Sequence, residues 1–430
     1  MRFTFRWSST RRCGAAVLVL SALGTACGGG GETAKGGGAS ASGGAANPGI
    51  VGDTIALGVL VPLSDAVALI GKPILTGAEI AVAQRNAEGG VGGKYPLKLL
   101  PEDVTYANPS TSVQKYNKLR DHVAGFAFIL GTDHVNVTLP LLAEDTLLAV
   151  PSTMDAEWVR EPQLVSALAP YQVEVINGVE YWVTKGGGKG KSLCTLAMST
   201  GYGAAGEEGA AFAAKQLGIS ITASAKFKPG DQDYVAPITQ LKNARCDAVV
   251  LVSLPSETGK ILGTAAQLQF APRWIGTGPS WHVVLGQSPV AAYAKEHLWV
   301  VADWPVWGDT TVAGMARFMA AQQKFAPAQK PDGYVLAGYV FASSMLAVLE
   351  EAAKHGDMSR TAIAKALTTL GTVSNGGLTG DYHYGPIETR ETPRVVSILV
   401  PEPAIPGGFG MVERGYTAAS ATAFKIEKRR

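Results

Sequence analysis

The sequence predicts an α/β protein built from two doubly wound, parallel-sheet lobes. Short, continuous apolar runs alternate with longer segments of helical period, which is typical of parallel strands covered by helices on both faces. This alternation starts again near the middle of the chain, as expected for two lobes of similar plan. With 430 residues, of which 47% are hydrophobic, the chain is long enough for two such cores.

The first lobe begins with the strand 54–61 and the helix 74–86. Its further elements are the strands 97–100, 125–130 and 147–150 and the helices 109–119 and 139–144. The connections between parallel strands must be right-handed crossovers. The carboxyl ends of these strands therefore meet at one edge of a sheet, where ligands of such folds bind.

The second lobe repeats this order from residue 192 onward. Its expected elements are the strands 192–198, 220–227, 248–254, 274–276 and 298–302 and the helices 204–217, 235–243 and 258–268. Helices follow over 311–325, 334–355 and 360–370, and a β-like tail covers 377–401. The uncharged run 334–349 is shorter than a membrane span needs, so we expect a buried helix there.

The N-terminal segment has the pattern of an export signal. Basic residues precede a short apolar stretch that ends in small residues before Cys27. This stretch is too short for a spanning helix, and its end resembles the lipobox of bacterial lipoproteins, in which the cysteine is acylated. The sequence predicts a signal peptide over 1–26, lipidation of Cys27 and a flexible, glycine-rich tether over 27–50. The Arg11-Arg12 pair leaves the twin-arginine export route open beside the general one.

The composition excludes several classes of function. A net charge of +2 leaves no excess of basic residues for a nucleic-acid face. The sequence lacks a nucleophile elbow, a phosphate-binding loop, a zinc-protease motif and any Cys/His cluster with metal-ligand spacing. We therefore expect no enzyme, no catalytic residue, no cofactor and no metal site.

Two cysteines, Cys194 and Cys246, remain after removal of the signal and lipidation of Cys27. An exported protein with two cysteines favours a disulfide, and two buried thiols on adjacent strands are the alternative. The two residues belong to the first and third strands of the second lobe. Those strands are neighbours in a sheet of order 2-1-3-4-5, so a bond requires Cα atoms within about 7 Å.

Polar residues follow several of the predicted strands, and these strand ends are the candidate ligand site. The candidates are Ser64, Asp65, Gly131, Thr132, Asp133, Ser152 and Thr153 in the first lobe and Tyr202, Ser253, Ser280 and Trp281 in the second. Gly131-Thr132 precede a helix, where free backbone N–H groups and a hydroxyl suit a carboxylate. A plain helix cap is the alternative role for Thr132.

Several segments resemble a known family in their order and spacing. They include Gly58-Val59-Leu60-Val61-Pro62-Leu63-Ser64, Asn86-Ala87-Glu88-Gly89-Gly90-Val91-Gly92-Gly93-Lys94, Leu130-Gly131-Thr132 and Gly201-Tyr202-Gly203. Over about residues 50–400 the chain is similar to the leucine/isoleucine/valine-binding branch of ABC-importer receptors, which have the type I periplasmic-binding-protein fold. The glycine pairs in the second segment suit a helix-to-strand turn with positive φ and are expected to shape the fold only.

The resemblance implies three hinge crossings between the lobes, near 169–171, 302–305 and 376–378. Lobe 1 would then contain 52–170 and 304–375, and lobe 2 would contain 171–303 and 376–430. The resemblance further implies an extracytoplasmic, monomeric receptor without enzymatic activity, which captures a small solute and delivers it to an ABC permease. A ligand-sensing lipoprotein that signals to a membrane partner is the alternative.

The resemblance also implies where the ligand lies. The family binds the ligand carboxylate at the loop of Thr132, and Tyr202 would close over the ligand from lobe 2. Amino-acid-binding relatives hold the ligand ammonium with an acid in the loop that is 276–281 here, and this loop contains none. Asp65, Asp133 and Asp303 are the acids left to replace it. The ligand is therefore expected among amino acids and related aromatic or aliphatic acids or amides.

Replacing Cys27 by serine tests the predicted anchor. Serine has no thiol to acylate, so the Cys27→Ser protein should be released from the membrane and should lose incorporation of labelled palmitate. The wild-type protein, expressed in parallel, is the control. Palmitate labelling of the variant at the wild-type level would refute the lipidation site.

Overall fold

The structure, a computed structural model, describes residues 47–428. The predicted signal peptide 1–26, Cys27 and most of the tether 27–50 lie outside this part. The tether ends earlier than predicted, because Asn47 is already buried and donates a hydrogen bond from Nδ2 to the Met358 carbonyl at 2.9 Å. Residues 50–51 then pair with the first long strand.

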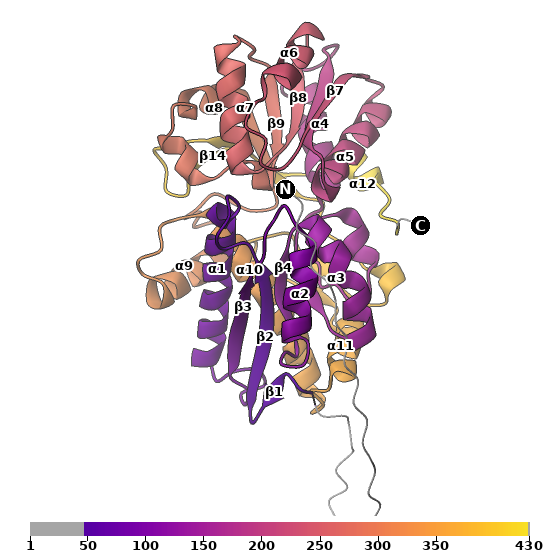
Figure 1. The fold of residues 1–430 in the computed structure, drawn as a ribbon, viewed down its shortest axis with the longest axis vertical. Coiled ribbons are helices and arrows are strands. Elements are labelled where there is room, and N and C mark those ends of the chain that lie inside the picture. Colours follow the sequence, from indigo (N-terminus) through magenta and orange to yellow (C-terminus); the bar gives the residue numbers. More distant parts are fainter. Residues whose placement is uncertain (1–46, 429–430) are drawn as a thin grey trace, which may run out of the picture. The chain divides into compact units, whose positions relative to one another are not determined.

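Lobe 1 is a sheet covered by helices on both faces (Figure 1). Its strands are β1 Ile50–Val51, β2 Thr54–Val61, β3 Leu97–Asp103, β4 Gly125–Leu130 and β5 Ala149–Ser152. β2 pairs in parallel with β3 and β4, and β4 pairs in parallel with β5. The helices are α1 Ala68–Ala87, α2 Ser110–Leu119 and α3 Thr132–Asp145, and the short 3₁₀ helix η1 covers Ala156–Arg160.

Later segments complete lobe 1. They are α9 Ala313–Phe325, α10 Gly333–Lys354, α11 Arg360–Thr369, β11 Thr372–Val373, β12 Tyr382–His383 and η4 Ile387–Thr389. α10 packs against α1, β4 and β5, and α2 and α3 pack together on the opposite face. α10 is long and apolar enough to cross a membrane, but 78% of its apolar window is buried, as expected for the core helix that the sequence predicts.

Lobe 2 has the strand order 2-1-3-4-5 that the sequence predicts, with two antiparallel strands added at one edge. Its strands are β6 Leu193–Met198, β7 Ile221–Phe227, β8 Ala248–Val252, β9 Arg273–Thr277, β10 Leu298–Ala302, β13 Val396–Pro401 and β14 Phe409–Tyr416. Its helices are α4 Tyr171–Thr184, α5 Gly201–Leu217, α6 Val235–Asn243, α7 Pro255–Gln267, α8 Ala291–His297 and α12 Ala419–Ala423, with η2 Gly278–Ser280 and η3 Val283–Gln287. The predicted α/β class with two parallel-sheet lobes is confirmed.

Two helices that contain proline are longer than predicted. α1 begins at Ala68 and contains Pro73, and α3 begins at Thr132 and contains Pro140. We expected the first of these helices to begin at residue 74, directly after Pro73, and an internal proline does remove a hydrogen bond and usually interrupts a helix. We expected the second to begin at residue 139, one residue before Pro140. Packing on the sheet outweighs this cost here, and the early start of α3 brings Thr132 to its first turn.

Helix α4 is absent from the sequence prediction. It contains many β-branched residues and is buried on almost every side, so it lacks the polar face by which a helix is recognised. Its buried polar side chains bond to other segments. Asn177, for example, donates to the Arg394 carbonyl at 3.1 Å and accepts from the Ala418 N–H at 2.7 Å.

The third passage between the lobes lies later than the predicted 376–378. Segment 382–390 still belongs to lobe 1, because Arg390 donates to the Glu161 and Leu164 carbonyls and the Tyr384 hydroxyl contacts the Ser166 carbonyl. The chain enters lobe 2 only before β13, where Arg394 donates to carbonyls near α12. The predicted boundary at residue 376 is therefore too early, because these arginine–carbonyl bonds leave no mark in the local sequence.

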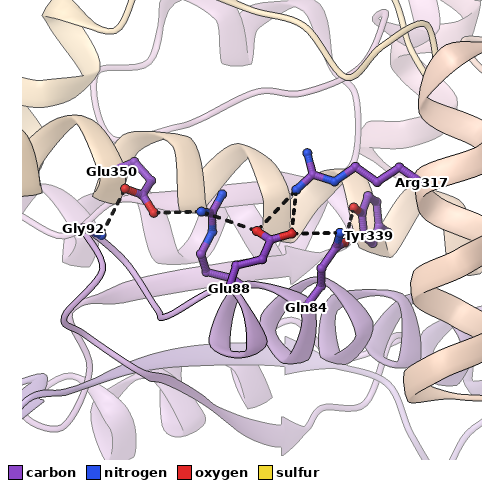
Figure 2. A network of polar contacts seen from close by, with 7 residues as sticks. Gln84, Glu88, Gly92, Arg317, Tyr339 and Glu350 are labelled. Atoms are coloured by element: carbon purple, nitrogen blue, oxygen red, sulfur yellow. Dashed lines mark hydrogen bonds and ion pairs between the residues drawn. The ribbon is translucent and has the colours of Figure 1, made fainter.

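A polar network ties the C-terminal end of α1 to α9 and α10 (Figure 2). Glu88 accepts from Arg317 at 3.1 Å and from Gln84 at 3.1 Å, and Gln84 accepts from the Tyr339 hydroxyl at 2.6 Å. Glu350 of α10 accepts from the N–H of Gly92 at 3.0 Å. Together these contacts fix the turn that follows α1.

The glycines of this turn, Gly89, Gly90, Gly92 and Gly93, all have positive φ, as the sequence predicts. The network therefore helps to hold α1 and α10 in register, and both helices contribute side chains to the site described below.

Cys194 of β6 and Cys246, which precedes β8, form a disulfide with Cα atoms 5.8 Å apart. β6 and β8 are parallel neighbours, as the sheet order requires. The separation is within the range that a disulfide tolerates. The two residues lie at the amino ends of their strands and so at the edge of the sheet away from the candidate site.

Candidate functional site

The carboxyl ends of the strands of both lobes face one cavity. It is lined by Ile70, Ile74, Tyr106, Leu130, Gly131, Thr132, Ser152, Thr153, Met154, Leu168, Tyr171, Tyr202, Leu254, Pro279, Trp304, Tyr334, Ala337 and Phe341. The free space is narrow, about 40 Å³. Since one buried water needs roughly 10–15 Å³ of such space, a larger solute can enter only when the lobes move apart.

One end of the cavity is polar and is built by the first turn of α3. Gly131 has φ +105°, and a Cβ there would lie 2.9 Å from the His134 ring, so glycine is required at this position. Thr132 follows as the first residue of α3, and its Oγ1 lies 2.6 Å from Oγ1 of Thr153. The free N–H groups of a helix N-terminus favour an anion.

Ser152 adds an unused hydroxyl to this polar end. Ser152 is 8% exposed, and within residues 47–428 its Oγ has no hydrogen-bond partner. Leaving a buried hydroxyl unpaired is costly, so this group is available for a ligand atom. Thr132, Thr153 and Ser152 thus present hydroxyls beside the helix N-terminus.

The rest of the wall is aromatic and aliphatic. Burial raises the pKa of Tyr106, Tyr171, Tyr202 and Tyr334 above the ordinary value of a phenol, so these hydroxyls stay neutral. Among the residues described, no Asp, Glu, Lys, Arg or His lines the cavity. The wall therefore suits an apolar body and offers no counter-charge to a cation.

Tyr202 lines the cavity from lobe 2, on the side where the resemblance places it. Its hydroxyl is already engaged, lying 2.6 Å from Thr277 Oγ1 and donating to the Ser253 carbonyl at 3.2 Å. Its ring packs on Tyr171 with centroids 4.6 Å apart. Tyr202 can therefore contact a ligand through its ring and not through its hydroxyl.

The structure places Gly131, Thr132, Ser152, Thr153 and Tyr202 in the cavity wall, and places the other predicted residues outside it. Ser64 is exposed. The Ser253 hydroxyl pairs with Thr258 at 2.6 Å, and Ser280 donates to the Leu251 carbonyl at 3.2 Å. Trp281 is 1% exposed and belongs to the hydrophobic core.

The three acids that could replace the missing ammonium partner have structural contacts instead. Asp65 accepts from the Tyr106 N–H at 2.8 Å and so fixes the loop that carries this wall residue. Asp133 accepts from the Gly201 N–H at 3.0 Å, and Asp303 is buried between chain crossings. None of them is among the residues that line the cavity.

Sequence reasoning missed most of the aromatic wall. Tyr171 and Trp304 lie on the first two crossings, and Tyr334 is the first tyrosine of α10. The predicted positions of the crossings could have identified Tyr171 and Trp304, because chain segments that cross between the lobes must pass beside the cavity. Tyr106, which follows β3, has no comparable signal and is positioned through Asp65.

An acid also reaches loop 276–281 from a distant helix. Glu174 of α4 is fully buried, and its Oε2 accepts from the Gly278 N–H at 3.1 Å. Burial raises the pKa of this carboxyl well above its usual range. Glu174 positions the loop from behind and does not line the cavity.

Cross-lobe contacts surround the cavity. The Tyr334 hydroxyl of lobe 1 donates to the Pro279 carbonyl at 2.8 Å. At the rim, His282 Nε2 lies 2.9 Å from Asp332 Oδ2, although not in hydrogen-bonding orientation. Such contacts form only when the lobes are close together.

The N-termini of α3 and α5 also approach each other across the cavity. Asp133 of α3 accepts from the Gly201 N–H between the two positive helix ends. A Cβ on Gly201 would lie 2.6 Å from Thr132 Cγ2, so only glycine permits this approach.

Two lobes that enclose one cavity at their strand ends define a solute-binding fold. A family model described as periplasmic binding protein matches residues 54–393. The chain belongs to this family, which confirms the family resemblance noted in the sequence.

Named relatives agree with this assignment. The Leu/Ile/Val-binding protein BraC3 of Rhizobium johnstonii is 28% identical over 217 residues, which are 48% of this chain and 56% of that protein. The Leu/Ile/Val-binding protein homolog 3 of Brucella melitensis is 26% identical over 221 residues, again 48% and 56%. The match with this chain thus spans about half the length of these relatives, and both are named as binding proteins, not enzymes.

Solved structures share the fold. A fatty acid ABC transporter substrate-binding protein from Thermomonospora curvata superimposes with a TM-score of 0.82 at 23% identity, covering 89% of this chain and 97% of that one. A branched-chain amino acid ABC transporter protein from Thermus thermophilus, with bound valine, superimposes with a TM-score of 0.74 at 17% identity. This match covers 86% of this chain and 98% of that one.

Replacing Thr132 or Tyr202 by alanine tests the two sides of the cavity. Thr132→Ala removes a hydroxyl from the polar end and should weaken ligand binding by about 1–3 kcal/mol, or roughly five- to a hundredfold. Tyr202→Ala removes ring contact from lobe 2 and should cost a similar amount. Calorimetry with whichever solute binds the wild-type protein measures both effects.

Thr368→Ala, on the exposed face of α11, is the matched control and should bind like the wild type. Unchanged affinity in both cavity variants would contradict the assignment of the site.

Proposed function

We propose that the protein is an extracytoplasmic, lipid-anchored receptor that captures a small carboxylate-bearing solute with an apolar body and delivers it to an ABC permease. The observation that carries this proposal is the division of one enclosed cavity into a polar end and an uncharged aromatic wall. The anchor at Cys27 and the tether would keep a monomeric receptor near its membrane partner.

The polar end supports a carboxylate as the group that is held. The first turn of α3 supplies the N–H groups of a helix N-terminus that has no side-chain cap from Gly131, and the hydroxyls of Thr132 and Ser152 lie beside it. All these groups can donate hydrogen bonds. A dry cavity strengthens such charge-assisted bonds, and they offset the cost of removing the carboxylate from water.

The wall supports an apolar body without a strong need for an ammonium group. Tyr171, Trp304, Tyr334 and Phe341 offer ring surface, while no acid lines the cavity within the described residues. A buried ammonium without a counter-charge would be costly. Aromatic or aliphatic carboxylates, and amides, should therefore compete with free amino acids.

The names of the similar proteins are consistent with this class of ligand. They refer to leucine, isoleucine and valine, to valine, and to fatty acids. Each of these solutes joins a carboxylate to an apolar body, and only the amino acids add an ammonium group. This shared chemistry is what we carry over to the present chain.

Closure of the two lobes around a solute supports a cycle of solute capture followed by release. A ligand that touches α3 of lobe 1 and Tyr202 of lobe 2 together stabilises the closed arrangement, because an open form offers only one of these surfaces. The cross-lobe bond of Asp133 to Gly201 would form at the same time. A permease that separates the lobes would then weaken both sets of contacts and release the solute.

A calorimetric screen of the purified mature protein tests the ligand class. The panel contains leucine, valine, phenylalanine, octanoate, benzoate, urea and short amides. We expect at least one acid without an ammonium group to bind at least as tightly as leucine, because the cavity has no acid for the ammonium. Octanol, which keeps the apolar body of octanoate without its charge, is the matched control and should bind much more weakly.

Tight binding of leucine with no binding of any solute outside the amino acids would overturn the proposed ligand class. Equal binding of octanol and octanoate would overturn the carboxylate anchor.

A further inference from the structure

The cavity runs across the strand ends of lobe 1, from one face of its sheet to the other. Its polar end lies at α3, on the face that α3 shares with α2. Its opposite end lies at the first three turns of α1 and α10, which pack together on the other face (Figure 1). Ile70 and Ile74 of α1 and Ala337 and Phe341 of α10 line that end, and all are apolar. A solute held by its carboxylate at α3 therefore directs its apolar body toward α1 and α10.

An open groove lies beside this apolar end. Its volume is about 800 Å³, against about 40 Å³ for the enclosed cavity. Leu69 and Pro73 of α1 line it from lobe 1, and Val283 and Val284 of η3 line it from lobe 2. Val284 is 44% exposed, which is unusual for a large aliphatic side chain. The groove thus offers aliphatic surface from both lobes.

A thin layer of paired side chains separates the cavity from the groove. Along α1, Ile70 lines the cavity while its neighbour Leu69 lines the groove. Between the lobes, Tyr334 lines the cavity and His282 lines the groove, and their rings stack with centroids 5.5 Å apart. The two spaces would therefore become continuous if Tyr334 and His282 moved apart.

The contact between Tyr334 and His282 is a seam between the lobes. His282 is held within lobe 2, where its Nδ1 accepts from the Val284 N–H at 3.1 Å. Asp332 is held within lobe 1, where its Oδ1 accepts from the Tyr334 N–H at 2.8 Å. Across the seam, His282 Nε2 lies 2.9 Å from Asp332 Oδ2 without hydrogen-bonding orientation. Parting the seam would break the bond from Tyr334 to the Pro279 carbonyl but neither of the two internal bonds.

The polar end of the cavity is closed more firmly. A Cβ on Gly201 would lie 2.6 Å from Thr132 Cγ2, so the two lobes are in close contact there. Asp133 also accepts from the Gly201 N–H at 3.0 Å. A solute that is longer than the cavity can therefore extend toward the seam but not past α3.

We propose that the groove is a second subsite, which takes the distal part of a long-chain aliphatic carboxylate whose chain leaves the cavity through the seam beside His282. This proposal rests on the proposed function, because it requires a carboxylate anchored at α3. It narrows the class of solute to acids with flexible aliphatic chains. Each methylene that enters the groove loses contact with water, and burial of apolar surface is favourable.

Calorimetry with hexanoate, octanoate and dodecanoate, each below its micelle concentration, tests this proposal on the purified mature protein. A methylene that is fully removed from water strengthens binding by up to about fourfold. We expect dodecanoate to bind at least tenfold more tightly than octanoate, because its four additional methylenes enter the groove. One dodecanoate should bind per chain.

Two variants place a charge in the groove, one from each lobe. Val284→Asp and Leu69→Asp should each weaken the binding of dodecanoate at least fivefold more than that of hexanoate, because an aliphatic chain cannot satisfy a carboxylate. Val284 is exposed, and the first turn of α1 favours an acid at residue 69, so both variants should fold. Val235→Asp is the matched control, since Val235 is 49% exposed and lies on α6 of lobe 2.

The outcomes separate this proposal from the proposed function. Binding of hexanoate or octanoate without tighter binding of dodecanoate would overturn the groove subsite and leave the proposed function intact. Two dodecanoates per chain, or equal dodecanoate affinity in Val284→Asp and Val235→Asp, would also contradict the subsite. Failure of every acid in the series to bind would contradict the proposed function and, with it, the subsite.

Discussion

The site depends on one constraint: the carboxyl ends of the parallel strands in the two lobes face each other. Each parallel sheet directs its carboxyl ends, and the N-termini of the helices that follow, toward the same edge. When the two edges meet, water is excluded from free N–H groups that still need partners. Asp133 satisfies one such group, at Gly201, whereas the first turn of α3 beside Thr132 has no side-chain cap from Gly131.

Exclusion of water also determines the chemistry of the wall. The tyrosines around the cavity stay neutral because burial raises the pKa of each. In such surroundings a single charge on a ligand interacts strongly with the few donors available, and an unmatched second charge is costly. Selectivity between an acid and an amino acid would therefore follow from the absence of a carboxylate in the described wall.

The connections between the lobes show how buried polar groups organise a chain that crosses three times. Asp303 accepts hydrogen bonds from backbone N–H groups, and Arg390 donates hydrogen bonds to backbone carbonyls of segment 161–164. Both side chains satisfy main-chain groups that no sheet or helix pairs. They fix where the connections lie, and with them the wall residues Tyr171 and Trp304.

The sequence predicted what depends on local pattern. Apolar runs located the strands of both sheets, and the glycine turn after α1 has the positive φ that its composition requires. The polar end of the cavity was predicted because Gly131-Thr132 follow a strand and precede a helix.

Features that depend on distant contacts could not be predicted in this way. α4 was missed because burial on all sides removes its helical pattern, and Pro73 concealed the start of α1. Trp281 was expected in the site because it follows a strand, but it is buried in the hydrophobic core and does not line the cavity. The third connection was misplaced because Arg390 holds its segment to lobe 1 through carbonyls more than two hundred residues away.

A crystal structure of the protein with the tightest-binding solute is the most direct test of the central claim, that one cavity between the lobes holds a carboxylate at one end and an apolar body at the other. We expect the solute's carboxylate within hydrogen-bond distance of Thr132 and Ser152, and its apolar part against Tyr171 and Trp304. A solute bound outside this cavity, or one held there with its carboxylate away from the first turn of α3, would contradict the account.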